Sequence, residues 1–412
     1  QKTFRIFREG KTNGVFQFES SGMKRYLKEL KPTELEDLIA MVSLYRPGPI
    51  ELIPSFIARK HGRERITYLH EKLKPILAPT HGIGVYQEQM MQIARDLAGY
   101  TLPEADTLRK AIGKKIKSLL EEQREKLIAG MRKNGIDQKT AQAIWELFPP
   151  FARYGFNRSH AACYALISYQ TAYLKAHWPA EFMASLMTAE GFEIERVGFL
   201  VEEARSLGIA ILPPSVNESN ATFTVVSPRE IRFGLGSVKN VGTNVVAAIV
   251  AARDARLPDL PDRQAGGQAG GAFASLDDLV ERVQSKDLNK KSMESLIKCG
   301  AFDQFGERGA LLANMDRMLE YARDIQRTRS AGQTSLFGGA DAGHRAVIRL
   351  EPAPAAEKKN RLAWEKELLG LYISEHPFEE YRERLAGKAT AVARLGEHPR
   401  DAVVSVAGLV AG

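Results

Sequence analysis

The sequence predicts a mainly helical, multidomain α+β fold in which the β elements are few and small. Through most of the chain, apolar residues recur at the i, i+3, i+4 and i+7 spacing of helices. Strand patterns are confined to residues 209–233 and to the segment that begins at Val403. The length of 412 residues is enough for roughly two to four domains.

Composition narrows the class of protein. Hydrophobic residues make up 44% of the sequence and charged residues 26%, which are the proportions of a globular protein. The net charge of +8 favours an anionic partner such as nucleic acid. Cys163 and Cys299 lie far apart, which excludes a disulfide framework and fits a reducing cytoplasm. No apolar run reaches about 18 residues, so we expect no membrane partner and a cytoplasmic location.

In the first half of the chain, spacing and turn residues predict successive helices. Residues 35–42 form one helical face, which ends before the rigid turn that Pro47 and Pro49 impose after Arg46. Further helices are predicted from residue 85 to 99, from 104 to about 133 and from 137 to 147.

In the second half, strands appear between helices. An amphipathic helix over residues 197–207 precedes a buried strand over 209–212, and apolar runs on both sides of Ser227-Pro228 predict a hairpin. Helices are also expected over residues 275–321 and 358–385, and an alternating strand from residue 403. The Gly-, Pro- and Ala-rich compositions of residues 257–272 and 328–357 predict flexible or surface-draped segments.

Residues 152–164 look like the centre of the chain, because two arginines, two tyrosines, an Asn, a Ser and a His stand there around a helix start. Asn157 and Ser159 are candidate helix caps, and Pro179 stops the helix. Helical spacing predicts that one apolar face of this helix consists of Ala162, Ala165, Leu166, Tyr169 and Tyr173.

This helix start has the chemistry of a binding site. Free N–H groups, a positive dipole end and two nearby arginines form a ready anion site. Tyr154 and Tyr164 offer flat faces to a base. A capped core helix preceded by a solvated basic loop explains the same residues about equally well.

A second candidate site is the basic segment over residues 105–115. Four of its cations fall within about two helical turns and repel one another, so an anion such as a polyphosphate is expected. These cations are Arg109, Lys110, Lys114 and Lys115. The alternative is a solvated basic face, the usual meaning of a charge run. The segment is not a phosphate-binding P-loop, because Leu108 stands where that motif needs a glycine.

Residues 234–249 resemble a helix-hairpin-helix, whose tight turn presents backbone N–H groups to a DNA phosphate. The first glycine of the common turn is Asn240 here, and Asn tolerates positive φ. The predicted DNA-binding residues are Lys239, Asn240, Gly242, Thr243 and Asn244. An ordinary strand-to-helix glycine turn is the alternative. No catalytic triad, metal cluster or paired carboxylate stands out, and no Asp-x-Asp pair occurs in the sequence.

Taken together, the motifs resemble those of the α subunit of bacterial DNA polymerase III, the C-family replicative polymerases. The resemblance covers essentially the whole chain. The matching motifs are residues 14–20 (GVFQFES), 44–49 (LYRPGP), 86–89 (YQEQ), 108–115 (LRKAIGKK), 154–160 (YGFNRSH), 169–170 (YQ), 175–177 (KAH), 211–214 (ILPP), the hairpin glycines, 299–303 (CGAFD), 370–372 (GLY) and 376–377 (HP).

The resemblance implies a division into parts of a polymerase. Residues 1–215 correspond to the fingers and residues 216–327 to a helix-hairpin-helix DNA-binding domain. Residues 328–360 correspond to a flexible segment with a clamp-binding motif, and residues 361–412 to a helical connector and the first strand of a truncated OB-fold. The catalytic palm would precede Gln1 and would hold the Mg²⁺ ions, so we expect this piece to bind no metal, to hold no catalytic residue and to be inactive alone.

The resemblance also implies roles for individual residues. Arg46 and the four cations of residues 109–115 would face the incoming nucleotide. Tyr154, Asn157, Arg158 and His160 would line the nascent base pair. The family's clamp-binding pentapeptide is matched by Gln333, Leu336 and Phe337.

The expected function is therefore that of a segment of a DNA-directed DNA polymerase. It would contribute binding of the incoming dNTP, contact with primer-template DNA and docking on the sliding clamp, alongside other subunits of the holoenzyme. Two alternatives are a stand-alone helix-hairpin-helix DNA-binding protein without enzymatic activity and a purely structural helical scaffold.

Overall fold

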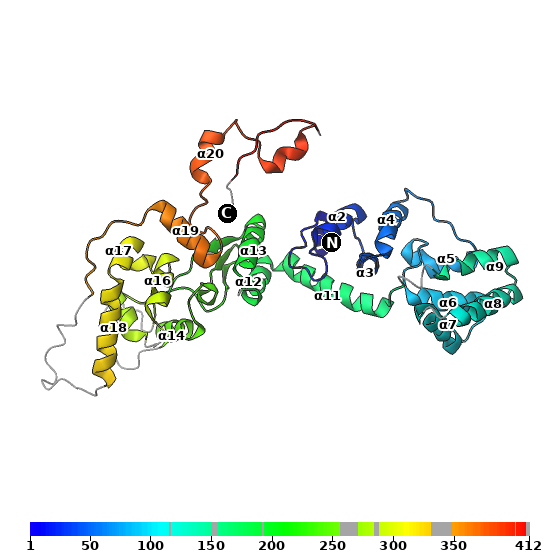
Figure 1. Cartoon of the computed structure of the whole chain (residues 1–412), viewed down its shortest axis with the longest axis horizontal. Helices are drawn as coiled ribbons and strands as arrows, with labels where there is room; N and C mark the ends of the chain where they lie inside the picture. Colours follow the sequence, from blue (N-terminus) through cyan, green and yellow to red (C-terminus); the bar gives the residue numbers. More distant parts are fainter. Residues whose placement is uncertain are drawn as a thin grey trace. The chain divides into compact units, whose positions relative to one another are not determined.

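The computed structural model describes residues 1–114, 117–149, 155–191, 193–255, 271–283, 288–330, 348–399 and 401–408. The fold is mainly helical with one small sheet in this part of the chain, as predicted. It divides into two compact units, residues 1–177 and residues 178–412 (Figure 1). The predicted domain boundary at residues 215–216 stays a prediction, since a compact unit need not coincide with a functional domain.

The first unit contains two hydrophobic cores. One lies among α1, α2, α3, α4 and α11, and the other among α5, α6, α7, α8 and α9. The elements are α1 (Lys2–Glu9), α2 (Ser21–Leu30), α3 (Leu35–Leu44), η1 (Pro49–Leu52), α4 (Ile53–Lys60), η2 (Glu71–Leu73), α5 (Lys74–Leu77), η3 (Ala78–Thr80), α6 (Gln87–Ala98), α7 (Leu102–Lys114), α8 (Lys117–Lys133), α9 (Gln138–Trp145) and α11 (Arg158–His177).

The second unit is built on a single core that extends from α12 to α19. Its elements are α12 (Pro179–Ala189), α13 (Ile194–Ser206), β1 (Ala210–Leu212), β2 (Thr224–Ser227), β3 (Glu230–Arg232), η4 (Leu235–Ser237), α14 (Thr243–Asp254), α15 (Leu276–Arg282), α16 (Lys290–Lys298), η5 (Asp303–Phe305), α17 (Arg308–Ala313), α18 (Met315–Ser330), α19 (Lys358–Leu369), α20 (Glu379–Leu385) and η6 (Val392–Glu397).

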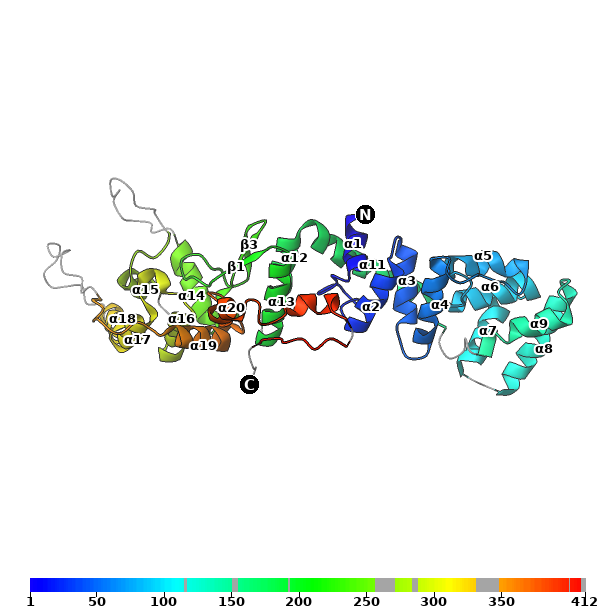
Figure 2. The same cartoon turned by 90° about the horizontal axis from the view of Figure 1, so that it is seen from above.

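The sheet has the strand order β1-β3-β2 and lies beside α12 and α13 (Figure 2). The antiparallel pair β2–β3 is the predicted hairpin, with Val225 opposite Ile231 and an irregularity in register before Ser227. β1 joins β3 in parallel, with Ile211 opposite Ile231.

The prediction of one long basic helix over residues 104–133 is wrong. The structure has α7 and α8, which pack against each other and against α6, and residues 115–116 lie outside the described residues. Both helices direct apolar side chains into one core, Leu108 from α7 and Leu127 from α8. A single straight helix could not bring both side chains to the same place.

The predicted apolar face of α11 is only partly right: Ala165 is buried and Ala162 and Tyr169 pack against the core, but the other two residues are exposed. Leu166 and Tyr173 are 46% and 39% exposed. The buried side is a stripe of small and polar residues, namely Ala161, Ala165, Ser168, Ala172, Lys175 and Ala176. Small side chains on this face allow α11 to lie close to α1 and α3. Because the buried residues are small or polar, the hydrophobicity of this face is low.

The strand predicted from Val403 is absent from the described residues 401–408, where Val403 is fully exposed. A strand needs a neighbouring strand for its ladder of hydrogen bonds. Thr390 N donates to Ser405 O at 2.7 Å, but this bond does not continue into a ladder over the described residues. Alternation of apolar residues alone therefore does not produce a strand.

An ion cluster around the buried side chains of Arg308 and Glu365 includes Asp303, the last residue of the motif over residues 299–303. The Arg308 guanidinium donates to both carboxylate oxygens of Asp303, at 2.9 and 2.8 Å, and to Glu365 Oε1 at 3.2 Å. Glu365 Oε2 accepts from the backbone N–H groups of Ile373 and Ser374, both at 3.0 Å. Arg308 Nη1 also donates to Lys298 O at 3.1 Å, so the cluster joins α16, α17 and α19, and the motif over residues 299–303 has a structural role in the second unit.

Candidate functional site

A backbone bridge forms the base of the site at the start of α11. Phe156 N donates to Val85 O at 3.1 Å, and Gln87 N donates to Phe156 O at 2.9 Å. The Gln87 side chain adds a bond from Nε2 to Gly155 O, 3.1 Å. These bonds fix the chain before α11 alongside the start of α6.

The first turn of α11 is capped from within the chain. Asn157 Oδ1 accepts from His160 N at 2.8 Å, so the predicted cap is confirmed. The Arg158 N–H donates to both oxygens of Glu88, at 3.1 and 3.0 Å. The helix start was expected to offer free N–H groups to an anion. That expectation is wrong for Arg158 and His160, because these two groups already have acceptors.

Arg158 projects from this turn into an exposed ion pair. Its Nη2 lies 2.6 Å from Glu36 Oε1, and the two side chains are 46% and 39% exposed. The guanidinium also lies over the ring of Tyr86, 5.8 Å from the ring centroid. Burial of Tyr86 raises the pKa of its hydroxyl, and this hydroxyl has no hydrogen-bond partner among the residues that the structure describes.

Arg46 reaches the same place from the turn after α3. Its Nε donates to Ser43 O at 2.7 Å, and its guanidinium lies 4.5 Å from the centroid of the Phe156 ring. Burial lowers the pKa of Arg46. The group remains a cation at neutral pH, and its partial desolvation strengthens its attraction for an anion.

A row of aromatic rings runs along α11 from this point. Phe156 and His160 meet edge to face with centroids 5.4 Å apart, and His160 and Tyr164 lie 4.3 Å apart. Phe16 extends the row, 5.3 Å from Tyr164. Three of these rings are spaced four residues apart on or just before the helix, so they form one surface that can stack on flat ligands. The predicted Tyr154 lies outside the described residues.

The cations of α7 have an internal counter-ion. Asp106 Oδ1 lies 2.8 Å from Arg109 Nη2, and Asp106 Oδ2 lies 2.8 Å from Lys110 Nζ. Hydrogen bonds from Lys110 and Arg109 lower the pKa of Asp106. Asp106 therefore offsets part of the repulsion between Arg109 and Lys110. The side chain of Lys114 and the whole of Lys115 lie outside the described residues.

The structure brings part of the predicted nucleotide site together. Arg46, Asn157, Arg158 and His160 all surround the bridge between Tyr86 and Phe156. Arg109 and Lys110 stand on α7, and their described ion pairs are to Asp106. Sequence reasoning missed Phe16, Glu36, Tyr86, Glu88 and Phe156 as members of this site. Phe16, Tyr86, Glu88 and Phe156 lie within the matching motifs, and the four-residue spacing of Phe156, His160 and Tyr164 was a further local signal, whereas Glu36 had neither.

The predicted hairpin turn lies in the second unit, before α14. Asn240 has a φ of 67°, the left-handed conformation predicted for it, and its Nδ2 lies 3.4 Å from Ser295 Oγ. Lys239 N donates to Leu368 O at 3.0 Å, which anchors the turn to α19. The predicted DNA-binding residues Lys239, Asn240, Gly242, Thr243 and Asn244 are all exposed.

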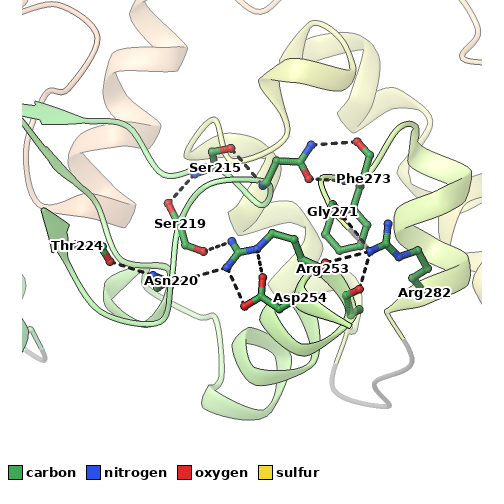
Figure 3. Close-up of polar contacts among 11 residues, drawn as sticks. Ser215, Ser219, Asn220, Thr224, Arg253, Asp254, Gly271, Phe273 and Arg282 are labelled. Carbon is green, nitrogen blue, oxygen red and sulfur yellow. Dashed lines mark hydrogen bonds and ion pairs between the residues drawn. The ribbon is translucent and has the colours of Figure 1, made fainter. Parts of the chain in front are cut away.

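Two arginines hold the far end of α14 (Figure 3). Arg253 is buried and donates to Ser219 O at 2.6 Å and to Asn220 Oδ1 at 2.8 Å. Arg282 Nη2 donates to Ala252 O at 2.6 Å, and so caps carbonyl groups at the end of the helix. These bonds hold α14 firmly in place. A helix that presents a turn to a ligand requires such a fixed position.

Other predicted sites fall outside these clusters. Gln333, Leu336 and Phe337 lie outside the described residues. Across the described ranges, no group of three or more His, Cys, Asp and Glu side chains is arranged to hold a metal ion. In the same ranges, no helix is long and apolar enough to cross a membrane.

Comparisons with known proteins agree with this arrangement. Residues 1–135 match the family described as bacterial DNA polymerase III alpha subunit finger domain, and residues 208–311 match the helix-hairpin-helix motif family. The chain is 43% identical, over 97% of its length, to DNA polymerase III subunit alpha of Thermus aquaticus, of which it covers 32%. It is 44% identical over its full length to the same subunit of Neisseria meningitidis, and 42% to that of Escherichia coli K12, covering 34% and 35% of those proteins.

The two family matches and the site geometry define a class of protein, in which a finger domain is followed by a helix-hairpin-helix motif. More particularly, the chain belongs to the bacterial DNA polymerase III α-subunit family. It spans about a third of the length of the curated relatives that it matches.

Proposed function

We propose that this chain is the part of a replicative DNA-directed DNA polymerase that binds the incoming dNTP and contacts primer-template DNA. The observation that supports this proposal is the cluster at the start of α11. There, two arginines from distant segments, Arg46 and Arg158, flank a row of aromatic rings. Cations beside flat rings suit a ligand that has both phosphates and a base.

Nucleotidyl transfer depends mostly on positioning and on stabilisation of charge on the phosphates. In this proposal Arg46, Arg109, Lys110 and Arg158 supply positive charge to the triphosphate, and Lys114 and Lys115 continue the basic series of α7. Tyr154, Asn157 and His160 would line the nascent base pair. The Mg²⁺ ions would be held by a palm domain elsewhere in the polypeptide, so this segment alone is proposed to be inactive.

The turn before α14 is proposed to contact the sugar-phosphate backbone of duplex DNA. Its exposed residues, the helix start at Thr243 and the net charge of +8 all favour a polyanion. Contact through backbone groups would be independent of base sequence, as a replicative enzyme requires.

Clamp docking is proposed for the pentapeptide that contains Gln333, Leu336 and Phe337. Gln333 would hydrogen-bond at the rim of a pocket that the two apolar side chains fill. Replacing Leu336 and Phe337 by Ala in the full polymerase should abolish clamp binding and processive synthesis and leave single-nucleotide incorporation nearly intact. Clamp binding by the double variant equal to that of the parent would place the contact elsewhere. Other holoenzyme subunits and a cytoplasmic location belong to the same proposal.

Steady-state kinetics test the nucleotide-binding role. In the full polymerase, Arg109→Ala should lower kcat/KM for the nucleotide by about 10- to 150-fold, because a charge-assisted phosphate contact contributes about 1.5–3 kcal/mol. Arg124→Ala is the matched control, since Arg124 is also paired with an acid three residues earlier, Glu121, at 2.8 Å. Equal kinetics for both variants and the parent would reject a triphosphate contact by Arg109.

A further inference from the structure

Two carboxylates already neutralise the start of α11, and they do so in different ways. Glu88, from α6, receives the backbone N–H of Arg158 on both of its oxygens. Glu36, from the first turn of α3, binds only the tip of the Arg158 side chain, at 2.6 Å. The two acids therefore act on different parts of the same residue.

Their contacts assign Glu88 a structural part. An N–H group in the first turn of a helix has no acceptor within the helix, so Glu88 satisfies a group that would otherwise depend on solvent. The bond also joins α6 to α11 next to the bridge between Tyr86 and Phe156. Glu88 is expected to stay in place when a ligand binds.

Glu36 is bound much more loosely. Both members of its pair with Arg158 are more than one third exposed, at 39% and 46%, and exposed ion pairs are weak. A triphosphate carries several negative charges and can form more than one hydrogen bond with a guanidinium, so it outcompetes a single exposed carboxylate.

We propose that Glu36 is an exchangeable counter-ion, which holds Arg158 in the free enzyme and gives it up to the phosphates of the incoming nucleotide. This inference rests on the proposed nucleotide-binding role of Arg158. α3 and α11 pack along each other, so rotation of the Glu36 and Arg158 side chains alone is enough for the exchange. Glu36 thus sets the affinity for the nucleotide without contacting it.

The sign of the effect separates this exchange from a positioning role. If Glu36 competes with the phosphates, Glu36→Gln in the full polymerase lowers KM for the dNTP about two- to fivefold, with kcat unchanged. If Glu36 instead positions Arg158 for catalysis, the same substitution raises KM or lowers kcat, and the proposal is overturned. Glu121→Gln, which removes an acid from the exposed Glu121–Arg124 pair on α8, should leave KM unchanged.

A double variant completes the test. Arg158→Ala should raise KM, and Glu36→Gln added to Arg158→Ala should then have no further effect, because the pair no longer exists. A fall in KM that persists without Arg158 would show a general charge effect and overturn the exchange. If Arg158→Ala raises KM while Glu36→Gln changes nothing, the proposed exchange is rejected and the proposed nucleotide contact of Arg158 stands. If Arg158→Ala leaves KM at the parent value, the proposed nucleotide contact of Arg158 fails, and the exchange fails with it.

Discussion

Lys175 shows how a single buried charge can organise the first unit. Its side chain is 1% exposed, and its Nζ donates to Lys11 O at 2.9 Å and to Asn13 O at 2.8 Å. These bonds fasten the loop between α1 and α2 to α11. The same loop carries Phe16, whose backbone N–H donates to Thr171 Oγ1 at 3.3 Å. The position of Phe16, at the end of the aromatic row, therefore depends on Lys175, which is not itself part of the row.

Replacing Lys175 by Met should lower the free energy of unfolding by about 1–3 kcal/mol. Methionine preserves the length and apolar stem of the side chain, but the backbone carbonyl groups of Lys11 and Asn13 lose a charged donor. Denaturant unfolding followed by circular dichroism measures the change. Lys139→Met on α9 is the control, because Lys139 is exposed and its substitution should change stability by less than about 0.5 kcal/mol. Equal effects at both positions would mean that the Lys175 bonds add no stability.

At the scale of single elements, the turn before α14 offers a test that separates binding from folding. Gly242 has a φ of −72°, which any residue can adopt, and within the described part of the chain no atom beyond its two chain neighbours lies within 4 Å of the position of an added Cβ. Gly242→Ala should therefore leave the fold intact. If a DNA phosphate approaches this backbone closely, the methyl group will block it.

We expect Gly242→Ala to weaken binding of the chain to primer-template DNA about tenfold, the lower end of the range for a charge-assisted phosphate contact. Fluorescence anisotropy of labelled DNA measures this affinity. Gly396→Ala is the matched control, since a Cβ there also meets no atom within 4 Å. Unchanged affinity of the Gly242 variant would remove this turn from the DNA interface.

Elements whose signal is local could be predicted from the sequence. The cap Asp137 and the stop after residue 147 were enough to locate α9, and Ser227-Pro228 located the hairpin of β2 and β3. The buried face of α11 could not be found in this way, because Ser168 and Lys175 point inward to polar backbone and small residues. The spacing of apolar residues does not detect a helix face whose small residues let neighbouring helices pack closely.

The same limit applies to the candidate site. Arg46, Asn157, Arg158 and His160 could be chosen from the sequence because their residue types suit an anion and a base. The pairing of Glu36 and Glu88 with Arg158 could not be predicted, since they lie 122 and 70 residues before it, and Glu36 lies in none of the matching motifs. A counter-ion supplied by a distant helix becomes visible only when the fold is known.

At the scale of the whole molecule, the chain combines two units, of which the first has two hydrophobic cores and the second has one. The nucleotide site is proposed for the first unit, and the helix-hairpin-helix turn lies in the second. This division agrees with the separate family matches over residues 1–135 and 208–311. The central claim for the first unit is that the base of the incoming nucleotide lies against the start of α11.

Photocrosslinking tests that claim most directly. A deoxynucleoside triphosphate with a photoreactive group on its base is bound to the full polymerase with primed DNA and irradiated, and the labelled peptide is identified by mass spectrometry. We predict labelling within residues 155–164, which include Phe156, His160 and Tyr164, and loss of this labelling when unmodified nucleotide competes. Labelling confined to residues 178–412, with none at the start of α11, would contradict the claim.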